Sequence, residues 1–143
     1  KKGNVDYPVE LVDLYPTVMD MLNMEAPKFL SGKSLKSYLV GDRNQIRDNA
    51  LTELRVWTPN GTAQGYSIKT KDYRITKWLY NDNLDFELYD LKNDKAELNN
   101  LANELAYQNV KDSLKIIIDK RIFEANIYPE GLGRQIENAE PTN

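Results

Sequence analysis

The sequence contains neither cysteine nor histidine among its 143 residues. Without cysteine the chain has no disulfide, no thiolate zinc site and no cysteine nucleophile. Without histidine it lacks the commonest general base and the commonest ligand for transition metals. Ser–His–Asp, Cys–His and histidine-based metal chemistry are therefore excluded within this chain. The lack of cysteine does not fix the compartment, because periplasmic and cytosolic proteins can both lack it.

Long apolar runs and an excess of basic residues are also missing. No apolar run approaches the length of a membrane helix and no signal peptide opens the sequence, so we expect no membrane association. The 19 Lys and Arg against 22 Asp and Glu give a net charge of −3, which argues against a nucleic-acid partner because phosphate neutralisation needs clustered cations. Hydrophobic residues at 41% and charged residues at 29% are typical of a globular chain of one domain, or of one small domain with a piece of another. Because the chain begins Lys-Lys-Gly without Met, we expect a processed or excised product.

Residues 1–45 predict two helical segments. Asp13 is expected to cap the first helix, over residues 11–23, and one or two further turns are expected over 34–39, ending at Gly41. The first helix has an apolar face at the three-to-four spacing, formed by Leu11, Val12, Tyr15, Val18, Met19 and Leu22.

Residues 50–91 predict an antiparallel sheet of about four strands, over 50–57, 66–70, 73–79 and 86–91. In the central hairpin, alternation places Arg74, Thr76 and Trp78 on the face opposite Ile75. A short helical turn is expected over 96–103, then a helix over 105–123 that packs on the sheet through Val110, Leu114, Ile117, Ile118 and Ile122. The fold class is therefore α+β.

Residues 92–103 are rich in carboxylates and amides, which admits two interpretations. A calcium loop is the first, but the alternating acidic ligands and the glycine of an EF-hand are absent. A turn before a capped helix is the second, with Asp94 accepting from free N–H groups and Asn99 or Asn100 bonding nearby backbone. We favour the turn, because short polar side chains are the usual turn formers. Asn60-Gly-Thr62 matches a glycosylation acceptor, but an Asn–Gly turn explains it equally.

The strands also concentrate aromatic residues, which could form a stacking platform for sugar rings or nucleic-acid bases. Aromatic residues suit strands in any case, and for most of them that is the better interpretation. Trp78 stands apart because alternation places it beside Arg74. The alternative for Trp78, at roughly even odds, is burial beneath the C-terminal helix against Ile117 or Ile118.

Three segments taken together resemble sulfatases. Residues 8–22 (PVELVDLYPTVMDML) and 30–35 (LSGKSL) resemble the end of the sulfatase catalytic domain. Residues 65–78 (GYSIKTKDYRITKW) are similar to a hairpin of the C-terminal subdomain, and 87–102 (ELYDLKNDKAELNNLA) to the segment that closes it. The sequence of the hairpin resembles iduronate-2-sulfatase-like members most. The resemblance implies that residues 1–45 end the catalytic domain, 46–125 form the C-terminal subdomain and 126–143 an extended tail.

The resemblance further implies a parent enzyme that hydrolyses sulfate esters on a carbohydrate of the uronate or glycosaminoglycan type, using Ca²⁺ and a formylglycine. Formylglycine is made from Cys or Ser in a Cys/Ser-x-Pro-x-Arg motif, which is absent here. We therefore expect this chain to be a C-terminal portion that has no catalytic residue, cofactor or metal of its own. The expected partners are the catalytic domain of the same polypeptide and a sulfated carbohydrate, in a secreted or periplasmic setting.

In sulfatases the C-terminal subdomain contributes one rim of the substrate pocket. The resemblance places that rim at Trp78 on the hairpin and at Glu53 and Arg55 in the first strand. The apolar face of the first helix implies that the isolated chain self-associates. Two alternatives stay open: a stand-alone carbohydrate-binding or interaction module, and the C-terminal part of a related phosphodiesterase or phosphatase.

Overall fold

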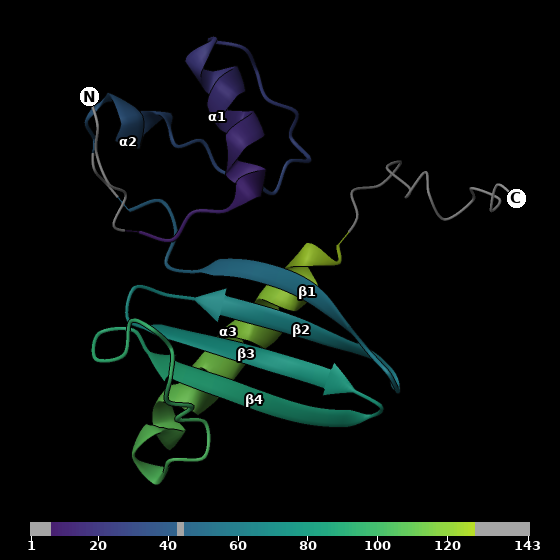
Figure 1. Cartoon of the computed structure of the whole chain (residues 1–143). Coiled ribbons are helices and arrows are strands. Elements are labelled where there is room, and N and C mark those ends of the chain that lie inside the picture. Colours follow the sequence, from purple (N-terminus) through teal and green to yellow (C-terminus); the bar gives the residue numbers. More distant parts are fainter. Residues whose placement is uncertain (1–6, 43–44, 128–143) are drawn as a thin grey trace, which may run out of the picture.

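The computed structural model describes residues 7–42 and 45–127. Two short helices lie beyond one edge of a four-stranded sheet, and a long helix crosses one face of that sheet (Figure 1). The expected tail over 126–143 lies outside the described residues except at its first two positions. In chain order the elements are η1 (Leu11–Asp13), α1 (Leu14–Met21), α2 (Lys36–Val40), β1 (Ala50–Thr58), β2 (Gly61–Lys69), β3 (Tyr73–Tyr80), β4 (Asn83–Asp90), η2 (Leu105–Tyr107) and α3 (Gln108–Ala125).

The strands form one antiparallel sheet in the order β1-β2-β3-β4, which confirms the α+β prediction. Two-residue turns join β1 to β2 and β3 to β4, so β2 and β4 begin earlier than the sequence predicted. Asn81 and Asp82, between β3 and β4, both have positive φ, at 45° and 64°. A type I′ hairpin turn needs this geometry, and Asn and Asp tolerate it better than other non-glycine residues.

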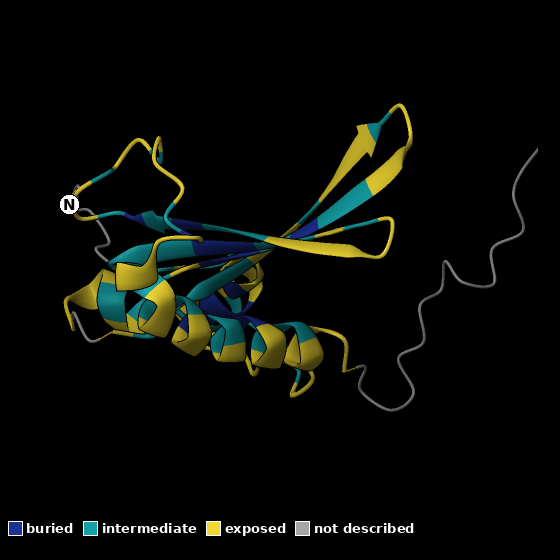
Figure 2. Cartoon of the chain, turned by 90° about the horizontal axis from the view of Figure 1, so that it is seen from below, coloured by how far each residue is buried: buried dark blue, intermediate teal, exposed yellow. Residues whose placement is uncertain are grey.

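The core lies between the sheet and α3. Ile75 is paired with Ile68 on β2 and with Leu88 on β4, and all three side chains are fully buried. From α3, Leu114 and Ile118 complete this cluster, as the apolar stripe predicted. Burying a side chain of this size contributes about 1.5–3 kcal/mol. The far ends of both hairpins extend past α3 and are largely exposed (Figure 2).

The helical turn expected over residues 96–103 is absent, so that prediction was wrong. A carboxylate oxygen of Asp94 accepts from the N–H groups of Leu98 and Asn99, at 2.8 Å each. The amide oxygen of Asn100 accepts from the N–H groups of Leu88 and Ala102, at 3.0 Å each. Side chains that bond local backbone in this way compete with helix formation. The turn in the second interpretation is confirmed, with Asp94 and Asn100 as acceptors, but the capped helix that it placed after the turn does not form.

The N-terminal segment buries its polar side rather than its apolar side. Asp13, Pro16 and Thr17 are the buried residues of η1 and α1. Most of the predicted apolar face is more than half exposed, namely Leu11, Val12, Tyr15, Val18 and Leu22. The short helix α2 ends at Gly41, as predicted, and the φ of 119° at that residue favours glycine.

Candidate substrate rim

The three residues predicted for the rim lie on two different faces of the sheet. The register between β1 and β2 is continuous, so side chains alternate strictly along both strands. Leu51 packs against the core beneath α3, which places Glu53 and Arg55 on the helix side of β1. Trp78 has the opposite parity to the buried Ile75 and therefore faces away from α3. The structure thus brings Glu53 and Arg55 together but separates them from Trp78.

On the outer face, Trp78 lines a hollow of about 230 Å³. Its indole lies over Gly65, where an added Cβ would approach ring atom Cζ3 to 2.7 Å. The absence of a side chain at Gly65 therefore makes room for the half-buried ring. Arg74 lines the same hollow, which confirms the prediction that Arg74 and Trp78 share one face of the sheet. The alternative of burial against Ile117 or Ile118 was wrong, because α3 packs on the other face.

Carboxylates dominate the charge of this outer hollow. The Arg74 guanidinium lies 2.8 Å from a carboxylate oxygen of Glu97 and is thereby neutralised. Burial first, and then the charges of Glu87 and Glu97, raise the pKa of the Tyr89 phenol. An anionic sulfate would meet two carboxylates here and a cation that is already paired. Glu97 is 23 residues beyond Arg74 in an irregular segment, so no periodic pattern could have predicted the pair.

The helix side of β1 offers a different polar arrangement. The Arg55 side chain is 65% exposed, and its ion pair with Glu53 is long, at 3.7 Å. Exposed pairs of this kind contribute little, so the guanidinium can change partner at low cost. On β2, the Gln64 amide donates to Glu53 at 2.9 Å and to the Tyr66 hydroxyl at 2.5 Å. This face therefore combines an available cation with several hydrogen-bonding groups.

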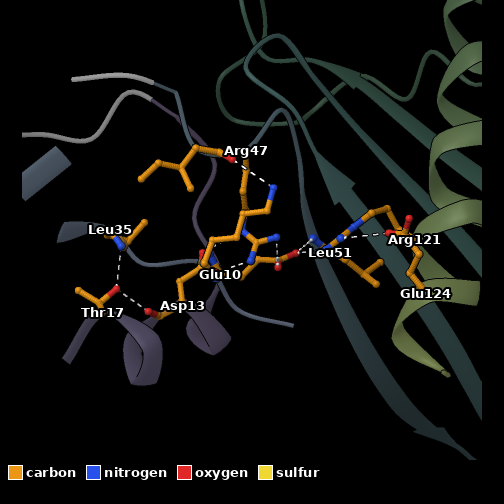
Figure 3. A network of polar contacts seen from close by, with 10 residues as sticks. Glu10, Asp13, Thr17, Leu35, Arg47, Leu51, Arg121 and Glu124 are labelled. Carbon is orange, nitrogen blue, oxygen red and sulfur yellow. Dashed lines mark hydrogen bonds and ion pairs between the residues drawn. The ribbon is translucent and has the colours of Figure 1, made fainter. Parts of the chain in front are cut away.

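A buried ionic network connects the N-terminal segment to the sheet (Figure 3). Arg47 donates to both carboxylate oxygens of Asp13 and lies 2.9 Å from a carboxylate oxygen of Glu10. The other oxygen of Glu10 accepts from the Leu51 N–H and from Arg121 on α3, both at 2.7 Å. The network therefore ties the segment before α1 to the start of β1 and to α3.

The network corrects the expected role of Asp13, whose side chain does not cap α1. Besides Arg47, its carboxylate accepts from the N–H groups of Lys33, at 2.7 Å, and Glu10, at 2.9 Å. Burial raises the pKa of Asp13, but these hydrogen bonds outweigh it and hold the pKa below the usual value. Sequence reasoning missed Arg47 because its partner lies 34 residues away.

Within residues 7–42 and 45–127, no cluster of three or more acidic side chains is arranged to hold a metal ion. None of the helices in these two ranges combines the length and the apolar character that a bilayer crossing requires.

A family model described as N-sulphoglucosamine sulphohydrolase, C-terminal, matches residues 1–123. The chain belongs to this sulfatase family. It is 26% identical over 125 residues to an N-acetylglucosamine-6-O-sulfatase of Bacteroides thetaiotaomicron, a match that covers 84% of this chain and 22% of the relative. The resemblance to sulfatases is thereby confirmed. The finer likeness to iduronate-2-sulfatase-like members stays a prediction.

Two solved structures share the fold. A 2-O GAG sulfatase superposes with a TM-score of 0.70 at 26% identity, over 79% of this chain and 24% of that one. A structure solved in complex with its substrate, D-glucosamine-2-N,6-O-disulfate, superposes with a TM-score of 0.68 at 25% identity, over 84% of this chain and 25% of that one. The chain therefore spans about a quarter of the length of these structures.

Proposed function

We propose that this chain is the C-terminal part of a sulfatase that hydrolyses sulfate esters on a carbohydrate of the uronate or glycosaminoglycan type. The family match over residues 1–123 carries this proposal. It is supported by a relative that is named for a sulfated glucosamine and by a similar structure that binds one. In the proposal, residues 1–45 complete the catalytic domain and residues 46–125 form the C-terminal subdomain. A secreted or periplasmic location belongs to the same proposal.

The chemistry of the parent enzyme would reside outside this chain. Ca²⁺ and a formylglycine would supply it, but the residues present do not fit either group. The sequence has no Cys/Ser-x-Pro-x-Arg motif, and the described residues offer no carboxylate cluster for Ca²⁺. This chain would instead supply packing against the catalytic domain and a rim for the substrate pocket.

The exposed apolar side of η1 and α1 is the surface that we propose packs against the rest of the catalytic domain. Leu11 and Leu22 are the most exposed of its side chains, and their neighbours Leu14, Tyr15 and Val18 are also more than half exposed. Contiguous apolar surface of this kind marks an interaction site. The same polypeptide is the occupant we favour, because the matched relative and the two structures are four to five times longer than the match.

For the rim, Glu53, Arg55 and Trp78 remain the candidates. Glu53 and Arg55 would act from the helix side of β1, and Trp78 would act from the outer hollow. The electrostatics favour the β1 pair for an anionic sugar, since Arg55 is exposed whereas Arg74, beside Trp78, is held by Glu97.

The test uses the full-length polypeptide that carries this chain. We expect it to hydrolyse both an aryl sulfate and a sulfated disaccharide, while the 143-residue chain alone hydrolyses neither and binds no Ca²⁺ at micromolar concentration. Full-length protein with a verified formylglycine and no sulfate release would contradict the proposal. Turnover of a phosphodiester instead would favour the phosphodiesterase alternative, and tight glycan binding by the 143-residue chain alone would favour the stand-alone module.

A further inference from the structure

Trp57 is the feature of β1 that the proposed function leaves unexplained. Its side chain is 84% exposed and lies one residue before the end of β1. Alternation along β1 puts this indole on the same side as Glu53 and Arg55. A large exposed aromatic ring is therefore aligned with an exposed cation and a carboxylate on one strand.

We propose that the helix side of β1 is a subsite for an anionic pyranose, in which the Trp57 indole stacks on the sugar ring. Arg55 pairs with the sulfate or carboxylate of that sugar, and Glu53 and Gln64 bond its hydroxyl groups. The subsite rests on the proposed function, and it deepens that function by naming the residues that hold the substrate's outer sugar. Indoles suit this role because they present a flat apolar face to the C–H groups of the ring.

The geometry of the strand supports the assignment. Residues two apart on one face of a strand lie about 7 Å from one another, so the anionic substituent of a sugar stacked on Trp57 reaches Arg55, and Glu53 lies about 7 Å beyond Arg55. Gln64 pairs directly with Arg55 across the β1–β2 ladder, so its amide borders the same space. The groups that bond sugar hydroxyls are thus next to the group that binds the anion.

The outer hollow competes poorly for the same ligand. Arg74 there has a carboxylate partner at 2.8 Å, whereas Arg55 has one only at 3.7 Å and is largely exposed. Binding a sulfate in the hollow would require the closer pair to break beside a second carboxylate, that of Glu87. On β1, the incoming anion replaces a weak exposed contact.

The experiment compares Trp57→Ala, Trp57→Phe, Arg55→Ala and Trp78→Ala in the full-length enzyme, with Phe123→Ala as the matched control. Phe123 is an exposed aromatic residue at the end of α3, outside the subsite. For a sulfated disaccharide, Trp57→Ala should lower kcat/KM about tenfold, mainly by raising KM, and Trp57→Phe should lose less. Hydrolysis of an aryl sulfate, which has no outer sugar, should stay within twofold of wild type in Phe123→Ala, and in the Trp57 and Arg55 variants it should fall less than hydrolysis of the disaccharide.

The anion is identified by the substrate arm of the same experiment. The wild type should prefer a disaccharide with a charged outer sugar over its uncharged analogue, and Arg55→Ala should remove this preference. Comparing disaccharides with a sulfated and with a uronic outer sugar shows whether Arg55 pairs with a sulfate or with a carboxylate. Binding should also quench the tryptophan fluorescence of the wild type, and this change should disappear in Trp57→Phe.

Three outcomes would overturn the subsite, and each differs from failure of the proposed function, in which the wild type itself hydrolyses no sulfate. The first is disaccharide kinetics in Trp57→Ala that match those of Phe123→Ala. The second is a disaccharide defect in Trp78→Ala alone, which would move the rim to the outer hollow. The third is an equal loss on both substrates with a lower melting temperature in Trp57→Ala, which would show that Trp57 packs against the catalytic domain.

Discussion

Replacing Arg47 by methionine should destabilise the domain strongly. The Arg47 side chain is 4% exposed, and it faces the carboxylates of Asp13, which is fully buried, and Glu10, which is 8% exposed. Methionine keeps much of the volume but removes the cation that these two carboxylates share. Glu10 retains Arg121 and Asp13 retains the Lys33 N–H, so both carboxylates stay only partly compensated. We expect the free energy of unfolding to fall by about 3–5 kcal/mol, the range for breaking a buried ion pair.

Urea unfolding of the 143-residue chain measures this loss, with Lys120→Met as the control. Lys120 is 73% exposed and lies 3.8 Å from Glu124, so that substitution should cost less than about 1 kcal/mol. Adding Asp13→Leu to Arg47→Met should restore part of the stability, because an apolar pair in place of a buried ion pair is often neutral. A loss below about 1 kcal/mol in Arg47→Met would refute the reasoning, since such a value is typical of exposed pairs.

Three further predictions concern pH, packing and association. The folded protein should lose stability as the pH falls below about 4. The pKa of Asp13 is lower in the folded state, so its stabilising contribution is fully present above the unfolded-state pKa and is lost as the pH falls through the folded-state pKa. Acid titration by circular dichroism should show a flatter profile in Asp13→Asn, and an unchanged profile would argue against this. Gly65→Ala should cost about 1–3 kcal/mol in thermal unfolding, because the new Cβ would meet the Trp78 ring at 2.7 Å; a neutral result would mean that the ring can move. Light scattering over a concentration series should show oligomers of the isolated chain through the exposed side of α1, and a monomer at high concentration would contradict it.

The sheet and α3 were predictable because their residues alternate or recur at the period of the element. Ile75 is fully buried, and Trp78 lies on the opposite face beside Arg74, as alternation predicted. Hairpins of this kind keep their register because slipping by one residue would expose the buried set. The same parity separates Glu53 and Arg55 from Trp78, although the resemblance had grouped all three in one rim.

Segments governed by specific side-chain bonds were not predictable in this way. The composition of residues 96–103 suits a helix, but Asp94 and Asn100 accept hydrogen bonds from local N–H groups and hold a non-helical turn. Asp13 has the residue type and the position of an N-cap, but its carboxylate accepts hydrogen bonds from the guanidinium of Arg47 instead. Contacts over such separations leave no period in the sequence, so only the folded chain reveals them.

The buried network and the proposed subsite meet at the edge strand β1. An edge strand is paired on one side only, so the N–H and C=O groups along its free side have no partner in the sheet. On β1, the Glu10 carboxylate accepts from the Leu51 N–H at 2.7 Å. The side chains of Glu53, Arg55 and Trp57 follow on the same face of the sheet as the side chain of Leu51. Arg47, in the loop before β1, and Arg121 on α3 in turn hold the Glu10 carboxylate. The strand that presents Trp57 is therefore held by the buried Glu10 carboxylate at Leu51, two residues before the subsite begins at Glu53.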